Sequence, residues 1–400
     1  MGAIGGIVDF RNSNINFNAL NAIQASQVLR GRGRSVAYLD CGIGMLYNAD
    51  EFSCGGQPIF SERRGYKTAL VIDSPFFDGC LAMEAYRAYG VEFIGMLRLP
   101  FAMALYDSER RMLLLARDKK GKKPLYYSVR SGKVLFSSEV KGLLATKNDS
   151  IRVNADILSA HLTSPIGIYS ASDIYADVYE VRQGECILFT EVGISKFFYR
   201  ESHDKKITVR SPLKFDEKIP LLTTCDIDRA AVFSALEDAL IAFDMPQFDT
   251  FMPSLCQLYL NAEKAKVSSF QFKDPIKRRS VFYSYEREDR LNAFYGKYGN
   301  GVIPKIDERE YDCIKEQNEQ ILKFLTEAFF SVDRNGMLFL KEVFGDAKWN
   351  CLLGIFGKSK VKREDTELYI RILGMIYQAV EWAKLRDIDL LRTENVSSHI

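Results

Sequence analysis

A stretch in the first half of the chain clusters charged side chains, four of which are lysines. Residues 117–124 read RDKKGKKP, where Gly121 can take a positive φ and Pro124 leads into the next segment, a pattern typical of a turn. Four clustered cations are costly to bury in an apolar core. The pattern therefore predicts either a solvated loop or a face that docks the chain's own second half or an acidic surface on a partner. The four ammonium groups belong to Lys119, Lys120, Lys122 and Lys123.

Metal and disulfide chemistry are not indicated by the other reactive side chains. The chain has three histidines and eight scattered cysteines, with no C-x-x-C pair. Such cysteines are typical of free thiols in a reducing compartment, so we expect a cytoplasmic protein. His161 lies in an amphipathic helical pattern, and we interpret it as a packing residue. We expect no metal site and no cofactor.

Composition excludes several classes of function. The 400 residues are 47% hydrophobic and 26% charged, as in an ordinary globular protein, and the net charge is +2. That balance argues against a nucleic-acid-binding protein, which normally carries a concentrated basic face. No apolar run approaches the roughly 20 residues that span a bilayer, and the N-terminus lacks signal-peptide features. We expect no membrane partner; the oligomeric state is left open.

Two β-hairpins are predicted to position the lysine-rich turn. Phe101, Met103 and Leu105 alternate with other residues in the period-2 pattern of a half-buried strand, and a short apolar return strand follows the polar turn at residues 107–110. A second pair of strands meets at Ser131-Gly132. The predicted strands and the helix after them cover residues 101–105, 112–116, 125–127, 134–136 and 139–144.

These residues resemble the end of the glutaminase domain of the asparagine synthetase B family. The shared phrase is RD-x-x-G-x-KPLYY, present here as RDKKGKKPLYY, followed by LFSSEVKGL. The resemblance continues in GGQP at residues 55–58, and in residues 151–162 and 174–188. It implies an α+β protein: a four-layer α/β/β/α, Ntn-hydrolase-like sandwich over residues 1–200, followed by a mostly helical domain over residues 201–400.

The resemblance also implies a glutaminase site, from which this sequence departs at the reacting group. The family begins M-C-G-I-x-G-I-V, and its cysteine is the nucleophile. The equivalent here is Gly2, which has no group that can become a thiolate. The family arginine that holds the substrate carboxylate corresponds to Met45, which cannot pair with an anion. Arg30 keeps the first position of the family's R-G-P-D loop.

The oxyanion-binding positions depart as well. Where the family has Asn, Gly and Glu, this chain has Asp73, Ser74 and Pro75. A carboxylate would repel a developing oxyanion, and proline has no backbone N–H to donate. Asp78 is the residue that aligns with a family aspartate of this site. We interpret Arg30, Met45, Asp73, Ser74 and Asp78 as a vestigial pocket.

The second half resembles a remnant of the family's synthetase domain. The family's ATP-pyrophosphate loop, S-G-G-x-D-S-S, is absent from residues 201–400, and residues 268–274 read SSFQFKD where the family has G-x-G-x-D-E. Of these, only Asp274 could supply a carboxylate. Long amphipathic helices are predicted over residues 310–330 and 364–384.

Three hypotheses follow for function. The first is an asparagine-synthetase-like pseudoenzyme, which serves as a binding or scaffolding subunit beside an active amide-forming synthetase or pathway enzyme. The second is an amidotransferase with relocated catalytic groups, drawn from Asp73, Ser74 or Cys54. The third is genomic decay, against which the intact aromatic core argues, since unselected cores accumulate buried polar groups.

Overall fold

A computed structural model describes the chain in two compact units. It describes residues 2–11, 15–27, 30, 34–49, 56–74, 79–147, 149–163, 170–202, 229–246, 318–357 and 366–391. The first unit is formed by Met1–Asn148, Asp177–Asp216 and Ser284–Asp289. The second is formed by Asp149–Ala176, Glu217–Tyr283 and Arg290–Ile400.

Two antiparallel sheets of six strands each form the centre of the first unit. One sheet has the strand order β11-β8-β9-β1-β3-β2 and the other β13-β12-β7-β6-β5-β4. The first contains β1 (Ala3–Asp9), β2 (Ser35–Asp40), β3 (Ile43–Asn48), β8 (Tyr126–Arg130), β9 (Lys133–Ser137) and β11 (Tyr179–Glu180). The second contains β4 (Ile59–Arg63), β5 (Tyr66–Asp73), β6 (Ala102–Asp107), β7 (Met112–Arg117), β12 (Glu185–Thr190) and β13 (Gly193–Phe198).

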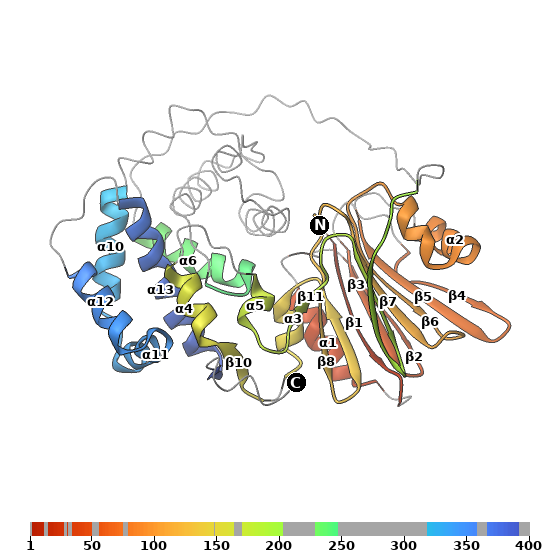
Figure 1. Ribbon diagram of the computed structural model, residues 1–400, viewed down its shortest axis with the longest axis horizontal. Helices are drawn as coiled ribbons and strands as arrows, with labels where there is room; N and C mark the ends of the chain where they lie inside the picture. The colour runs from red at the N-terminus through yellow and green to blue at the C-terminus, as the bar shows by residue number, and fades with distance from the viewer. Residues whose placement is uncertain are drawn as a thin grey trace, which may run out of the picture. The chain divides into compact units, whose positions relative to one another are not determined.

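Helices cover the outer faces of both sheets. Helix α1 (Phe17–Ser26) packs on β1 and β3, and α3 (Val140–Leu144) packs on β8 and β9. Helix α2 (Gly79–Tyr89), which continues into the 3-10 helix η1 (Gly90–Met96), packs on β4 and β5. The helices thus flank the two sheets on opposite sides (Figure 1). The predicted four-layer α/β/β/α sandwich is confirmed.

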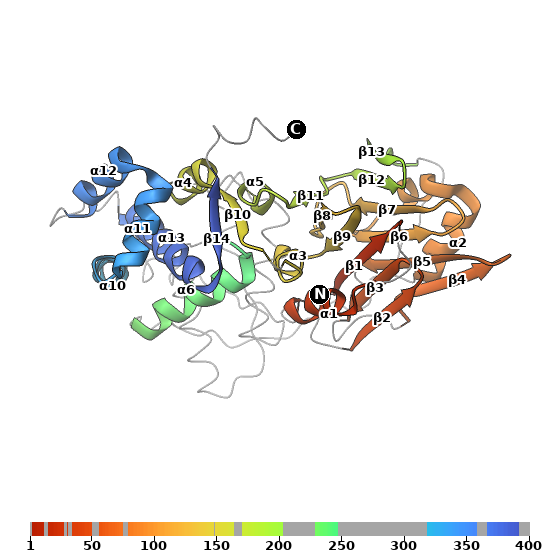
Figure 2. The ribbon, with the colours of Figure 1, turned by 90° about the horizontal axis from the view of Figure 1, so that it is seen from below.

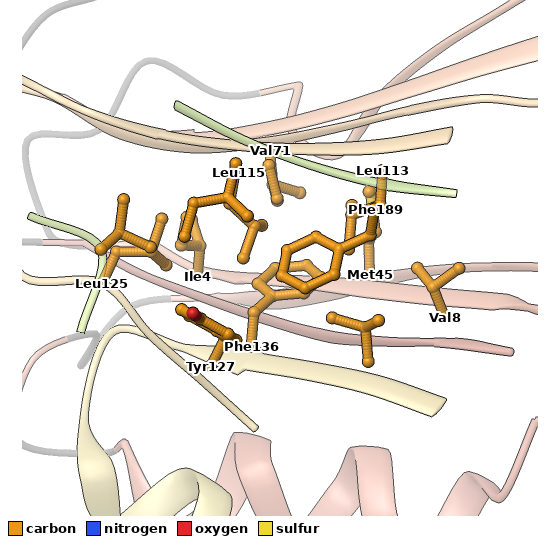
Figure 3. Close-up of a cluster of buried hydrophobic side chains, with 14 of the residues drawn as sticks. Ile4, Val8, Met45, Val71, Leu113, Leu115, Leu125, Tyr127, Phe136 and Phe189 are labelled. Atoms are coloured by element: carbon orange, nitrogen blue, oxygen red, sulfur yellow. The ribbon is translucent and has the colours of Figure 1, made fainter. Parts of the chain in front are cut away.

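An apolar layer between the two sheets, here called the inter-sheet core, holds the sandwich together. It combines alternate residues of both sheets, among them Ile4, Met45 and Phe136 from one sheet and Val71 and Leu115 from the other (Figure 3). Each of these five side chains is fully buried. Burial of apolar surface contributes about 25 cal/mol per Å², so this layer contributes strongly to the stability of the unit.

The two predicted hairpins are confirmed. Strands β6 and β7 pair across the polar turn, and β8 and β9 pair across Ser131-Gly132, both of which have positive φ (49° and 78°). Helix α1 begins at Phe17, because the Asn16 side chain accepts a hydrogen bond from the Ala19 N–H (3.3 Å) and so caps it.

The second unit is mostly helical, as predicted. Its helices are α4 (Ala155–Thr163), α5 (Ala171–Ile174), α6 (Arg229–Phe243), α10 (Asn318–Phe330), α11 (Arg334–Phe344), α12 (Asp346–Phe356) and α13 (Thr366–Leu385). Strand β10 (Ile151–Asn154) pairs in parallel with β14 (Ile388–Leu391), beside which it lies in Figure 2. Helix α13 packs against α4, α6, α10 and α11 and buries Trp382. The prediction for residues 364–384 is therefore confirmed.

The compact units divide the chain differently from the boundary expected near residue 200. Residues 149–176 belong to the second unit, because β10 pairs with β14 and α4 packs on α11 and α13. Within α4, His161 is buried and its Nε2 lies 2.8 Å from the Pro246 carbonyl oxygen. That contact agrees with a packing role for this histidine.

The close approach of β1 to β3 and β9 gives a direct test of the sandwich. A Cβ added at Gly6 would lie 2.5 Å from the Gly44 carbonyl oxygen and 2.5 Å from Phe136 Cζ, whereas one added at Gly193 would meet no atom within 4 Å. We expect Gly6→Ala to lower the free energy of unfolding by about 1–3 kcal/mol and Gly193→Ala to change it by less than about 0.5 kcal/mol. Urea denaturation followed by circular dichroism measures both; equal effects would contradict the packing described.

Candidate functional site

The register of the second sheet brings Asp73 to the same end as the lysine-rich turn. Asp73 ends β5 and pairs with Ala102 at the start of β6, which in turn pairs with Arg117 at the end of β7. The chain then turns through residues 118–123, here called the basic turn, before entering β8 of the other sheet. Asp73, one of the positions expected to form the vestigial pocket, therefore lies where the chain passes from one sheet to the other.

Asp73 lies between two cations at this crossing. Its Oδ2 accepts a hydrogen bond from an Arg30 terminal nitrogen at 3.3 Å, and its Oδ1 lies 3.3 Å from Lys123 Nζ. All three side chains are buried: the Arg30 side chain is 0% exposed, that of Asp73 2% and that of Lys123 9%. We call these residues the Asp73 ion cluster. Removing one partner of such a buried pair costs about 3–5 kcal/mol, because it leaves a buried charge without its counter-ion.

The space beside Gly2 is filled by an aromatic ring. A Cβ added at Gly2 would lie 2.9 Å from Tyr47 Oη and 3.1 Å from Tyr47 Cε2. Tyr47 is itself buried and belongs to the inter-sheet core. A side chain at residue 2 would therefore have to displace a packed ring.

Met45 has also become part of the core. It pairs with Gly6 of β1 and Tyr38 of β2, and it is fully buried among the apolar side chains labelled in Figure 3. A thioether there contributes packing and offers no charge to an anionic substrate.

Ser74 makes a local contact with the backbone. Its hydroxyl donates a hydrogen bond to the Pro100 carbonyl oxygen at 2.7 Å. Three other positions considered in the sequence, Cys54, Asp78 and Asp274, lie outside the described residues.

The four lysines of the basic turn differ in exposure, which corrects the expectation that they act as one surface. Lys119 and Lys120 are exposed and Lys122 is half-buried, but Lys123 is buried against Asp73. Lys123 therefore pairs with a buried carboxylate inside the protein and is not part of the exposed docking face.

Asp118 organises the backbone of the basic turn. Its carboxylate oxygens accept hydrogen bonds from the Lys120 N–H (3.0 Å) and the Lys123 N–H (3.3 Å). Burial nevertheless raises the pKa of Asp118, an effect that these backbone donors oppose. The Asp118 carboxylate thus holds the backbone of the turn in one conformation, and the exposed ammonium groups extend from that backbone.

Sequence reasoning missed Tyr47 and the burial of Lys123. A signal for Tyr47 was available: it lies two residues after Met45 on one strand, so both side chains point to the same face. The contact between Lys123 and Asp73 had no local signal, because it depends on how the turn between two sheets folds back.

Among the described residues no group of three or more His, Cys, Asp or Glu side chains could hold a metal ion. None of the helices described is both long enough and apolar enough to cross a membrane.

The chain is similar to several known proteins over different parts of its length. Residues 77–201 match the family model described as a glutamine amidotransferase domain. The chain is 24% identical over 317 residues to the glutamine-hydrolyzing asparagine synthetase 3 of Bacillus subtilis, a match that covers 77% of this chain and 48% of that relative. A further 65 residues, 16% of this chain, are 45% identical to amidase chyE of Penicillium rubens, of which they cover 10%. Among solved structures, the glutamine phosphoribosylpyrophosphate amidotransferase of B. subtilis complexed with ADP and GMP aligns with a TM-score of 0.34 and 11% identity, over 72% of this chain and 70% of that one.

The four-layer sandwich and the matched domain define the class as glutamine amidotransferase-like. The similarity to an asparagine synthetase extends well beyond the matched domain. The chain spans about half the length of that B. subtilis relative.

The difference in exposure among the lysines can be measured by chemical labelling. We expect an amine-reactive acetylating reagent to modify Lys119 and Lys120 at least about tenfold faster than Lys123, because buried amines react only through local opening. Mass spectrometry of the labelled peptides gives the rates. Lys133, a partly exposed lysine paired with Asp9, serves as the reference. Equal labelling of Lys120 and Lys123 in the native protein would contradict the Asp73 ion cluster.

Proposed function

We propose that this chain is an asparagine-synthetase-like pseudoenzyme, which does not hydrolyse glutamine and acts as a binding or scaffolding subunit beside an active amide-forming enzyme. The observation that carries the proposal is the contact between Gly2 and Tyr47. Residue 2 has no nucleophile, and the volume that a nucleophilic side chain would need is taken by a buried ring. Cysteine chemistry at this position therefore lacks a sulfur nucleophile and the space for a side chain that would carry it.

The charges at the oxyanion-binding position support the same proposal. In catalysis by an oxyanion hole, fixed donors point at the developing negative charge. Here the corresponding residue, Asp73, is a carboxylate, and it is already paired with Arg30 and Lys123. A second anion beside it would meet repulsion from Asp73 and compete with it for both cations.

The basic turn is the surface we propose for docking. Lys119 and Lys120 are exposed, and the Lys119 ammonium lies 5.9 Å from the centre of the Tyr199 ring. The Lys119 N–H also donates to the Tyr199 hydroxyl at 3.1 Å, so the exposed cations project from a fixed backbone. An acidic surface on a protein partner fits this charge. We place the protein in the cytoplasm, with the amide-forming enzyme as its partner.

The alternative proposal, an amidotransferase with relocated catalytic groups, has less support from the described contacts. Asp73 is engaged by two cations, and the Ser74 hydroxyl donates to a backbone carbonyl, where a nucleophilic serine would donate to a base.

Glutamine hydrolysis is the first test. We expect no ammonia release from glutamine above the uncatalysed background for the wild-type chain. Gly2→Cys should stay inactive, because removing a single oxyanion donor already lowers kcat by about 100- to 1,000-fold, and here a carboxylate stands at that position. Coupled measurement of ammonia and glutamate gives the rate. Steady turnover that persists after all eight cysteines are changed to serine would support the relocated-site alternative and overturn the pseudoenzyme.

Charge reversal tests the docking surface. We expect Lys119→Glu/Lys120→Glu to weaken association with a co-expressed amide-forming synthetase at least about tenfold, and the difference to shrink as salt rises. Surface-plasmon resonance at two salt concentrations measures both effects. Arg63→Glu/Arg64→Glu is the matched control: Arg63 ends β4 and Arg64 follows it, and these adjacent exposed cations lie at the opposite end of β5 from Asp73. Equal losses in the two variants, or none in either, would refute a specific role for the basic turn.

A further inference from the structure

One lysine side chain connects two helices of the second unit. Lys348 is the third residue of α12, and its Nζ donates hydrogen bonds to two oxygens of Ser159 on α4: the hydroxyl at 2.9 Å and the backbone carbonyl at 3.3 Å. The centre of the Phe344 ring, at the end of α11, lies 5.5 Å from the same Nζ. Ser159 is buried, whereas Lys348 is exposed. The amine is therefore held in a defined position and can still be reached from solvent.

This amine has no carboxylate to stabilise its charge. Among the described residues Lys348 forms no ion pair, and partial burial lowers its pKa below the ordinary value for lysine. Two other lysines of the second unit are paired: Lys341 lies 2.9 Å from Asp346, and Lys384 lies 2.9 Å from Glu381. An amine that loses water without gaining a counter-ion gives up its proton more easily, and the neutral form is the nucleophile.

The position of Lys348 in its helix acts in the same direction. Helix α12 begins at Asp346, so Lys348 lies in the first turn, where the aligned peptide dipoles disfavour a cation. The two oxygens of Ser159 also match the two N–H groups of a neutral amine, whereas an ammonium has three. The Phe344 ring has two opposite effects, because its face attracts a cation and its bulk keeps water away from Nζ.

Other charged or titratable groups on the helices around this amine do not change its pKa. Burial is the cause of the shift, and no charged group on the described parts of α4, α11 or α12 contributes to it. The groups on these three helices are Asp156, His161, Arg334, Lys341, Glu342, Asp346 and Cys351.

Exposed lysines elsewhere differ in how the amine is held. Lys323 lies in the middle of α10 and, among the described residues, its side chain forms neither an ion pair nor a hydrogen bond. Lys119 and Lys196 lie over the rings of Tyr199 and Tyr127, at 5.9 and 5.6 Å. Lys348 differs from all three because hydrogen bonds fix its Nζ at the beginning of a helix.

We propose that Lys348 is an acylation site, whose ε-amine accepts the acyl group of an acyl phosphate. The neutral amine attacks the acyl carbon and forms a C–N bond, while the C–O bond to phosphate breaks. Phosphate leaves with the bonding electrons and takes up the proton that the nitrogen loses. The amide product is uncharged and has one N–H, so it can keep only one of the two hydrogen bonds to Ser159. This inference does not rest on the proposed function, because it concerns neither glutamine nor the basic turn.

The experiment incubates the full chain with acetyl phosphate at about pH 7.5 and follows each lysine by peptide mass spectrometry. We expect Lys348 to be acetylated at least about fivefold faster than Lys323, the exposed reference, and Lys341, the ion-paired reference. The ratio of Lys348 to Lys323 should fall toward one above about pH 10.5, because lysines with an ordinary pKa are then also neutral.

Two variants of nearly equal shape test the role of charge. Ser159→Asp places a carboxylate beside Nζ and should slow acetylation of Lys348 at least about fivefold, because an ion pair stabilises the ammonium. Ser159→Asn is the neutral control and should change the rate less than about twofold. Circular dichroism establishes that both variants fold. If Ser159→Asp does not fold, the wild-type pH profile decides: the rate at Lys348 should level off at a lower pH than the rate at Lys323.

Three results would overturn the inference. Equal acetylation of Lys348 and Lys323 at every pH would show that the amine is an ordinary surface lysine. A plateau for Lys348 at the same pH as for Lys323 would mean that its proton is held as tightly as in an ordinary lysine. Equal slowing by Ser159→Asp and Ser159→Asn would mean that the rate follows the shape of residue 159 and not its charge.

Discussion

The inter-sheet core is the constraint on which the rest of the first unit depends. Two antiparallel sheets can stack only if alternate residues of both supply a continuous apolar layer, and here the layer includes Ile4, Val71, Leu115 and Phe136 (Figure 3). The same layer contains Met45 and Tyr47, two residues at or beside positions where the family binds and attacks glutamine. In this chain both residues serve packing.

The pseudoenzyme that we propose would keep this scaffold without its chemistry. A catalytic pocket lowers the free energy of unfolding, since it leaves space unfilled and polar groups poorly paired. Tyr47 fills the space beside Gly2, and the Asp73 ion cluster pairs the charges at the crossing between the sheets. A buried ion pair adds little net stability compared with apolar side chains of the same volume. The contact between Lys123 and Asp73 links the end of β5 to the turn that leads into β8 of the other sheet.

The sequence was informative where the signals are local. The hairpins around residues 107–112 and Ser131-Gly132 follow from period-2 alternation and turn residues, and both are confirmed. The four-layer arrangement came from the family resemblance, since two stacked sheets leave no unique pattern in composition. Contacts between distant segments were missed: β10 pairs with β14 at the far end of the chain, which moves residues 149–176 into the second unit. Lys123 resembles its exposed neighbours in sequence, and only its contact with Asp73 distinguishes it.

The central claim is that the former glutamine site is now occupied by the protein's own side chains, and binding of glutamine to the wild-type chain tests this most directly. Isothermal titration calorimetry with L-glutamine, repeated with L-glutamate, measures it without any need for turnover. Our account predicts no heat of binding with either amino acid up to about 10 mM, because Tyr47, Met45 and Asp73 leave neither the space nor the free cations. Saturable binding of glutamine with a Kd below about 1 mM, which corresponds to about −4 kcal/mol, would contradict it.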